Sequence, residues 1–250
     1  MLMDMIDSAP DAHPLIRKLE SIADLTREEK EALLSLPMVV KTFPADHDIV
    51  SIGDRPSESC LLLDGWTCRY KMLPDGGRQI MSFHIPGDVP DFQSLYLKTM
   101  DHSLGTLTPV KVALIQHRDL QHLVRRYEGL ATALWRDSLI DAAIFREWMV
   151  GIGRRTAHER ITHLLCEMAT KLRMVQLNDG HSYPWPVTQQ EVADALGLTD
   201  VHVNRVLRDL RTSGLITFAR GWFKAVDWEG MKKLGQFDPG YLHVEPGIAA

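Results

Sequence analysis

Four side chains in the last quarter of the chain have the types and spacing needed to read the edges of base pairs. They recur at helical spacing, so one helix would place them on a single face: Val201, Asn204, Arg205 and Arg208. An arginine can donate two hydrogen bonds to guanine O6 and N7, an asparagine can bridge adenine N6 and N7, and valine can contact a thymine methyl group. This face predicts a helix that lies in the major groove of double-stranded DNA.

The sequence also predicts the elements that would position this face. The opposite side of the same segment is apolar at spacing i, i+3, i+4, i+7, namely Val203, Val206, Leu207 and Leu210. Thr199 can cap the start of the helix. Gly214 followed by Leu215 fits a left-handed cap at its end. We therefore expect a capped, half-buried recognition helix over residues 199–212.

A first helix precedes this one across a tight turn. Thr188 and Glu191 have capping-box spacing, and Val187 and Val192 can form the hydrophobic staple around it. Gly197 lies where the chain must turn sharply. An ordinary helical hairpin with solvated arginines is the alternative, but it does not account for both caps, the turn and the polar face together. The expected DNA interface comprises Thr188, Gln189, Gln190, Thr199, Val201, His202, Asn204, Arg205 and Arg208.

The charge distribution agrees with this interpretation when it is divided by region. The 250 residues carry a net charge of −5. Residues 150–235 contain 12 basic against 9 acidic residues, whereas the remainder contains 16 against 24. The weakly basic part can supply phosphate contacts. The chain has no apolar run long enough to span a membrane, and its acidic start lacks the pattern of a signal peptide, so we expect a cytoplasmic protein.

The first half of the chain predicts a β-rich domain. A helical segment over 15–36 is followed, between residues 41 and 116, by short segments in which apolar and polar residues alternate. Asp64-Gly65 and the segment 74–77 have the composition of hairpin turns. Several short strands at this spacing favour an antiparallel jelly roll over residues 15–117.

From residue 118 to 153 the sequence is helical, with a break expected near 127–129 and an interruption and hinge at Gly151-Ile152-Gly153. Its apolar stripe could pack on the jelly roll or on a second copy of the chain, and we expect the second copy because paired half-sites need a dimer. The expected dimer interface comprises Leu130, Leu134, Phe145, Trp148, Met149 and Ile152.

Residues 154–231 predict a winged helix-turn-helix domain. Thr156 and Glu159 form a further capping box, the segment 178–180 predicts a hairpin, and two short strands around Arg220-Gly221 predict a wing. The tail over 236–250 is rich in glycine and proline, and we expect it to be poorly ordered. The predicted fold class is α+β: a jelly roll, a long dimerisation helix and a winged helix-turn-helix.

This order of domains resembles the CRP/FNR family of bacterial transcription regulators. The resemblance is most specific at TQQEVADALGLTDVHVNRVLRDL and at LLLDGWTCRYKMLPDGGRQIMSFHIPGD. It implies a homodimer that binds a palindromic DNA site and works with RNA polymerase. Arg205 matches the family's recognition-helix arginine, Thr188 and Gln190 match positions that contact phosphates, and Asn204 stands where FNR-like members carry serine.

The sequence departs from the family in the recognition helix and where signals are bound. Val201 replaces the usual recognition-helix glutamate. Cyclic-nucleotide-binding members carry a glutamate for the ribose and an arginine for the phosphate, and these positions fall on Phe92 and His102. We therefore expect no cyclic AMP binding and leave the effector open. The candidate effector pocket comprises Gly87, Asp88, Phe92, His102 and Ser103, where His102 could hold a smaller anion or be a solvated loop residue.

The cysteine content predicts neither a metal nor another cofactor. Three cysteines, Cys60, Cys68 and Cys166, are too few for the four thiolates of an iron-sulfur cluster, and we expect Cys60 and Cys68 to be core residues. Cysteine oxidation and haem stay open, with His84, His102 and His117 as candidate haem ligands.

Two other classes of function remain to be compared with a DNA-binding regulator. A ligand-binding module that regulates a partner protein is the alternative, and it would not need the base-reading face. The sequence gives little support for an enzyme. The only cluster that resembles a catalytic site is Asp88 and Asp91 near His84 and His102, and it lies on turns where aspartate is common.

Overall fold

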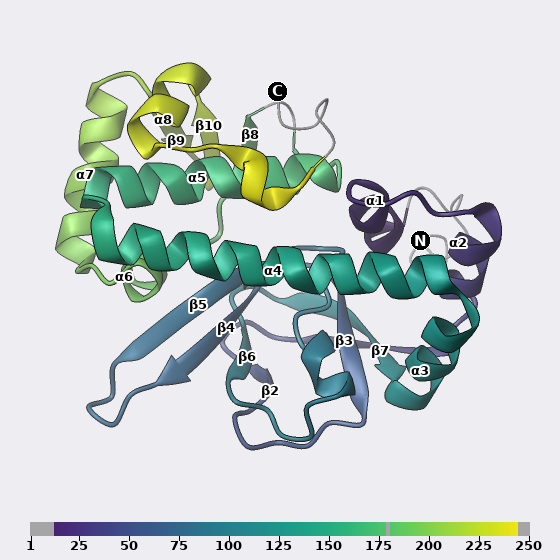
Figure 1. Cartoon of the computed structure of the whole chain (residues 1–250). Coiled ribbons are helices and arrows are strands. Elements are labelled where there is room, and N and C mark those ends of the chain that lie inside the picture. The colour runs from purple at the N-terminus through teal and green to yellow at the C-terminus, as the bar shows by residue number, and fades with distance from the viewer. Residues whose placement is uncertain (1–12, 179–180, 245–250) are drawn as a thin grey trace. The chain divides into compact units, whose positions relative to one another are not determined.

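The computed structural model describes residues 13–178 and 181–244 (Figure 1). Its described residues form two compact units, one over 13–71 and 83–141 and the other over 72–82 and 142–244. None of the helices in these residues has both the length and the apolar character that a membrane span requires. Each unit has its own core.

The first unit contains two antiparallel sheets and a set of helices. The sheets have the strand orders β1-β7-β3 and β2-β6-β4-β5, and the second extends through β5 into the other unit. The strands are β1 (Met38–Phe43), β2 (Asp48–Val50), β3 (Glu58–Asp64), β4 (Thr67–Met72), β5 (Arg78–His84), β6 (Ser103–Thr106) and β7 (Val110–Gln116). The helices are α1 (Pro14–Glu20), α2 (Arg27–Leu34), η2 (Phe92–Leu95), α3 (His117–Arg126) and the first half of α4 (Glu128–Arg154). This confirms the predicted β-rich domain.

Two apolar clusters hold this unit together. Side chains of β3 and β7 that face the helices pack with α1, α3 and α4, as with Leu61 and Ala113. Side chains on the opposite faces of the same strands, such as Leu62 and Val112, pack between the sheets. The strands are therefore buried on both sides, which explains why their sequences are nearly continuous apolar runs.

The turn at Asp64-Gly65 is not a hairpin, contrary to the sequence prediction. β3 pairs with β7 and β4 pairs with β6, so this turn passes between the two sheets. Gly65 has φ +83°, and a Cβ there would clash with the carbonyl oxygen of Pro109. An Asp-Gly pair supplies the required positive φ in either kind of turn, so its sequence cannot distinguish them. The turn at 74–77 does join neighbouring strands, β4 and β5.

The predicted helix break is confirmed at Tyr127, between α3 and α4, but the predicted interruption at the glycine pair is wrong. α4 continues through Gly151 and Gly153 to Arg154. A glycine inside a helix costs only about 1 kcal/mol relative to alanine, and the neighbouring turns offset this. The helical run ends where Thr156 caps α5 (Ala157–Met174), because Thr156 adopts an extended conformation.

The second unit is a winged helix-turn-helix. It contains the second half of α4, α5, β8 (Ser182–Pro184), α6 (Gln189–Leu196), α7 (Asp200–Thr212), β9 (Ile216–Ala219), β10 (Trp222–Ala225), α8 (Trp228–Gly235) and η3 (Pro239–Leu242). Its sheet has the order β8-β10-β9. Tyr183 and Phe223, both fully buried, occupy paired positions of β8 and β10, with their ring centroids 4.8 Å apart.

The start of the expected disordered tail is packed. Phe237 and Leu242 are buried, and the Tyr241 hydroxyl donates to Oε2 of the buried Glu167 at 2.6 Å. The prediction of poor order is therefore wrong for 236–244, because this segment carries apolar side chains that cover α5. Residues 245–250, and residues 179–180 of the predicted hairpin, lie outside the described residues.

Candidate nucleic-acid interface and sensor site

The predicted turn between α6 and α7 is present. Gly197 has φ +62°, the left-handed region that glycine adopts without steric cost. The Leu198 N–H donates to the carbonyl oxygen of Ala193 at 3.1 Å. This closes the end of α6 and directs the chain into α7.

The start of α6 is a complete capping box. Thr188 Oγ1 accepts from the Glu191 N–H at 3.2 Å, and Oε2 of Glu191 accepts from the Thr188 N–H at 2.6 Å. The Thr188 hydroxyl donates to the same carboxylate at 2.9 Å. The backbone N–H groups of Gln189 and Gln190 belong to the first turn, where no intrahelical acceptor exists, so they suit a phosphate better than the Thr188 hydroxyl does.

α7 has the predicted buried and exposed faces. Val203, Val206 and Leu210 are buried, while the base-reading positions are exposed, namely Val201, Asn204, Arg205 and Arg208. Thr199 accepts from the His202 N–H at 3.3 Å and so caps the start of the helix.

The end of α7 is a Schellman cap. Gly214 has φ +75°, and the N–H groups of Gly214 and Leu215 donate to the carbonyl oxygens of Arg211 and Leu210, each at 3.1 Å. The recognition helix is therefore fixed at both ends.

Two pairs of polar side chains order the α6–α7 surface. Asn204 Nδ2 donates to Gln189 Oε1 at 3.0 Å, which joins the two helices. Gln190 Nε2 donates to Asp194 Oδ1 at 2.7 Å within α6. Gln189 and Asn204 were both expected in the interface, but their contact cannot be read from the sequence, because it depends on how two helices cross.

The wing is formed by β9 and β10. Arg220 and Gly221 both have positive φ, +53° and +77°, as a tight two-residue hairpin turn requires. Arg220, Lys224 and Trp222 are exposed, Trp222 to 48%. The wing thus presents two cations and a large ring.

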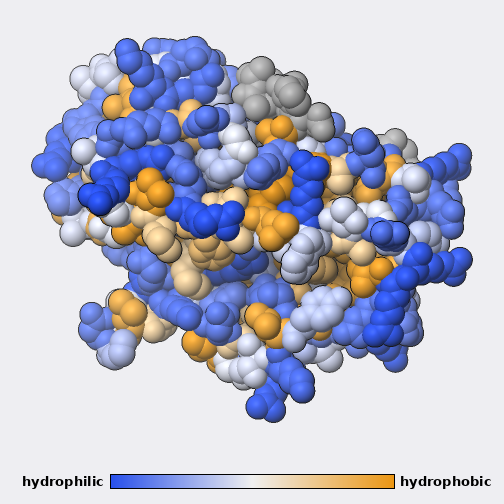
Figure 2. Space-filling model, in the orientation of Figure 1, coloured by the Kyte–Doolittle hydropathy of each residue, from blue (hydrophilic) through white to orange (hydrophobic). Residues whose placement is uncertain are grey.

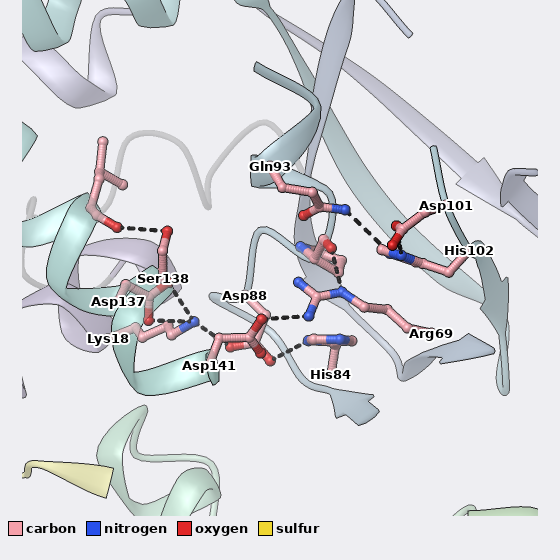
Figure 3. A network of polar contacts seen from close by, with 12 residues as sticks. Lys18, Arg69, His84, Asp88, Gln93, Asp101, His102, Asp137, Ser138 and Asp141 are labelled. Atoms are coloured by element: carbon pink, nitrogen blue, oxygen red, sulfur yellow. Dashed lines mark hydrogen bonds and ion pairs between the residues drawn. The ribbon is translucent and has the colours of Figure 1, made fainter. Parts of the chain in front are cut away.

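In the first unit, the residues of the Gly87-Asp88 pair are used for internal contacts. A Cβ at Gly87 would lie 2.7 Å from the carbonyl oxygen of Pro14, so this loop fits closely against α1. Asp88 is buried and accepts from Lys18 Nζ at 2.7 Å and from the Ile85 N–H at 3.1 Å, with His84 Nδ1 3.2 Å away (Figure 3). Asp88 therefore supports the fold and is not an open pocket residue.

The other candidate pocket residues also make contacts within the protein. Phe92, on η2, packs against the apolar core. His102 is only 7% exposed and lies 2.7 Å from Asp101 Oδ1 and 3.2 Å from Gln93 Nε2, so the interpretation as a solvated loop residue is wrong. Ser103 Oγ accepts from the Ile52 N–H at 3.0 Å.

The charge state of His102 bears on the small-anion hypothesis. Burial lowers its pKa, and the nearby Arg69 charge lowers it further despite the opposing effect of Asp101. The imidazole is therefore neutral at neutral pH and supplies no positive charge to an anion.

Arg69, a buried residue that the sequence did not single out, lies at the centre of a charged network (Figure 3). Arg69 Nε donates to the carbonyl oxygen of Pro90 at 2.6 Å, and Nη1 contacts Asp141 Oδ2 of α4 at 2.5 Å. Lys18 of α1 pairs with Asp137, one turn earlier on α4, at 3.0 Å. The signal in the sequence was the placement of Asp137 and Asp141 one turn apart in an otherwise apolar stripe.

The pKa shifts follow from this pairing. Burial alone would raise the pKa of Asp141, but the Arg69 guanidinium holds it below its ordinary value. Burial likewise opposes the charge of Lys18, but Asp137 and Asp88 raise its pKa above the ordinary value. Lys18 and Asp141 are thus charged at neutral pH, whereas burial raises the pKa of Asp137 despite the opposing effect of Lys18. The two pairs join α1 and β4 to α4.

The three cysteines are buried and free, in agreement with the expectation that Cys60 and Cys68 are core residues. Burial raises the pKa of the Cys60 and Cys166 thiols, so both are protonated at neutral pH and poorly reactive. Over residues 13–178 and 181–244, no group of three histidine, cysteine or acidic side chains could hold a metal ion.

The candidate haem ligands have polar partners in this structure. His84 and His102 belong to the contacts described above, and His117 Nε2 lies 3.0 Å from Ser94 Oγ. Burial lowers the pKa of His117.

The expected dimer interface on α4 needs correction. Leu130, Leu134 and Trp148 are at most 8% exposed, because the core of their own chain covers them. They cannot also form a surface seam. Of the remaining predicted residues, Phe145 is half-buried, while Met149 and Ile152 are exposed.

The exposed apolar residues of α4 include three that the sequence analysis did not select, Trp135 (65%), Leu139 (52%) and Val150 (48%). With Met149 they follow the heptad-like spacing of one helical face. Figure 2 shows apolar side chains gathered along α4, which crosses the middle of Figure 1. We call Trp135, Leu139, Met149 and Val150 the α4 seam.

Comparisons with known proteins support both units. A family model described as a Crp-like helix-turn-helix domain matches residues 159–234, and one described as a cyclic nucleotide-binding domain matches residues 40–127. Nitrogen fixation regulation protein FixK of Rhizobium meliloti (strain 1021) is 29% identical over 187 residues, which cover 74% of this chain and 81% of that protein. Transcriptional activator protein FnrL of Cereibacter sphaeroides is 24% identical over 195 residues, or 76% of this chain and 78% of that protein.

Among solved structures, FixK2 from Bradyrhizobium japonicum superposes with a TM-score of 0.73 at 24% identity, covering 80% of this chain and 98% of that one. This likeness shows a shared fold.

Proposed function

Because the chain belongs to the CRP/FNR family of DNA-binding transcription regulators, we propose that α7 reads a palindromic DNA site in the major groove, once from each protomer of a homodimer. The observation that carries this proposal is the exposed face of α7. Asn204, Arg205 and Arg208 present donors and acceptors on a helix that is capped at both ends and anchored by a buried apolar face. Such rigidity is needed for side chains that must meet base edges.

We propose that contacts with phosphates come from the surroundings of α7. The first turn of α6 offers N–H groups and a helix dipole, and the wing offers Arg220 and Lys224. These contacts fix the position of the protein on the duplex, whereas base contacts determine the sequence.

We expect Arg205→Ala to cost roughly 1–3 kcal/mol per half-site and to relax preference at one base position, because a guanidinium that forks onto guanine is lost. Arg211→Ala, on the same helix, is the matched control. Arg211 donates through Nε to its own helix, to the carbonyl oxygen of Leu207 at 3.2 Å, so its loss should weaken binding to all sequences alike. Selection from a random duplex library, repeated with each variant, measures both effects. An Arg205→Ala protein that selects the wild-type motif with equal stringency would show that another surface reads the DNA.

We further propose a regulator with no catalytic step, which works in the cytoplasm with RNA polymerase and responds to an effector other than cyclic AMP. The positions for the ribose and the phosphate of that nucleotide hold Phe92, which packs against the core, and His102, which is neutral at neutral pH. The guanidinium of Arg69, close to His102, is paired with Asp141. A bound phosphate would have to compete with that carboxylate.

A further inference from the structure

The contact between Asn204 and Gln189 assigns a role in DNA specificity to a residue outside the recognition helix. We propose that Gln189 is a positioning residue which fixes the Asn204 amide so that it reads adenine. This inference rests on the proposed DNA-binding function and deepens it. Its basis is the 3.0 Å hydrogen bond from Asn204 Nδ2 to Gln189 Oε1, between two exposed side chains on different helices.

The chemistry of the amide explains why its orientation matters. An asparagine side chain has two N–H groups and one carbonyl oxygen, and rotation about its last torsion is broad. When one N–H is donated to Gln189, the other N–H and the oxygen remain. Adenine offers the complementary pair in the major groove, an N7 acceptor and an N6 donor. An amide that is already fixed in the free protein also loses less rotational freedom on binding.

The position of Gln189 suits this task. It is the first residue of α6, directly after the Thr188 cap, and the capping box holds the backbone there in place. Its neighbour Gln190 has a different partner, since it donates to Asp194 within α6. The two adjacent glutamines therefore differ in one respect that an experiment can use: the Gln189 amide is bonded to the recognition helix, and the Gln190 amide is bonded to its own helix.

The test separates the acceptor function of Gln189 from its effect on charge. Gln189→Glu keeps an oxygen that can accept from Asn204, but adds a negative charge beside the phosphates. Gln189→Lys has no acceptor, but adds a positive charge. If Gln189 positions Asn204, Gln189→Glu should bind all DNA more weakly and keep the adenine preference. Gln189→Lys should bind all DNA more tightly and lose that preference.

The preference is measured on duplexes selected by the wild-type protein. Asn204→Ala identifies the adenine position as the one whose preference it abolishes, a loss of about 5- to 150-fold in discrimination. Gln189→Ala should lose at least half of that discrimination on a logarithmic scale, and Gln189→Ala with Asn204→Ala should lose no more than Asn204→Ala alone. Gln190→Ala, the matched amide, should lower affinity while leaving the adenine preference intact. Thermal melting confirms that the variants are folded.

Two outcomes overturn the inference. One is a Gln189→Lys protein that keeps the full adenine preference, and the other is a double variant that loses preference at a further position. Failure of the proposed function looks different, because the wild-type protein would then select no motif. If wild type selects a motif that Arg205→Ala alters but Asn204→Ala does not, the function stands and only the role of the amide pair fails.

Discussion

Two aspartates of the first unit, the buried Asp91 and the partly buried Asp141, have pKa values that shift in opposite directions because their partners differ. Burial raises the pKa of Asp91 to about 6, although its Oδ1 accepts from the Cys60 N–H at 2.7 Å. Asp141 has a guanidinium beside it, and its pKa lies below the ordinary value. A neutral donor thus compensates a buried carboxylate less well than a cation does.

This difference predicts that the stability of the protein depends on pH through Asp91, and that Asp91→Asn removes this dependence. Between pH values of about 4 and 6 the folded chain holds a proton on Asp91 that the unfolded chain has released. The stabilisation that protonated Asp91 provides is therefore fully present below its pKa in the unfolded chain. It is lost as the pH rises through its pKa in the folded chain. Relative to the variant, the free energy of unfolding of the wild type should fall by on the order of 1 kcal/mol for each pH unit as the pH rises across this range.

Denaturation of both proteins at several pH values measures the difference. The asparagine keeps an acceptor for the Cys60 N–H, so the variant should fold. Asp141→Asn is the comparator, because a carboxylate with a lowered pKa loses its contribution only as pH falls below about 3.8. Parallel profiles for wild type and Asp91→Asn from pH 4 to 6 would contradict this account.

At the scale of elements, features that neighbouring residues determine could be predicted from the sequence. Features that depend on residues far along the chain could not. The capping boxes of α5 and α6 lie within four residues each, and both are present as predicted. The sheet to which β3 belongs depends on β7, about fifty residues away, and the hairpin predicted at Asp64-Gly65 failed for this reason. The Asn204–Gln189 contact escaped the sequence analysis for the same reason.

The corrected face of α4 changes what a charged substitution should do there. Leu139→Glu places a charge on the exposed α4 seam, where a symmetric dimer would meet it twice, so we expect folded monomers. Leu134→Glu places a charge in the core, where Leu134 is 5% exposed, so we expect loss of the fold in that unit. Sedimentation velocity combined with thermal melting distinguishes the two results. A Leu139→Glu protein that stays dimeric would place the dimer contact elsewhere.

At the scale of the whole molecule, the sequence indicated the order of domains through its resemblance to a family, and the two family models agree with that order. It could not indicate the partly buried ion pairs, because Lys18, Arg69 and Asp141 are far apart along the chain and each is a common surface residue type. These pairs connect α1 and β4 to the helix that carries the α4 seam. The first unit thereby holds the first half of α4 through charge as well as through apolar packing.

The proposed symmetric dimer makes the spacing of its DNA half-sites a testable quantity. Two recognition helices that enter successive major grooves need half-sites about 10–10.5 bp apart, centre to centre. Inserting 5 bp turns the second half-site to the opposite side of the duplex, where the same dimer cannot reach it. Affinity should then fall at least about tenfold, because each lost base-pair readout alone costs roughly 1–3 kcal/mol. Fluorescence anisotropy should give the same affinity for this duplex as for one whose second half-site is scrambled. Equal binding to the inserted and the selected duplex would mean that each protomer reads its half-site independently, and the dimer would not be the unit of recognition.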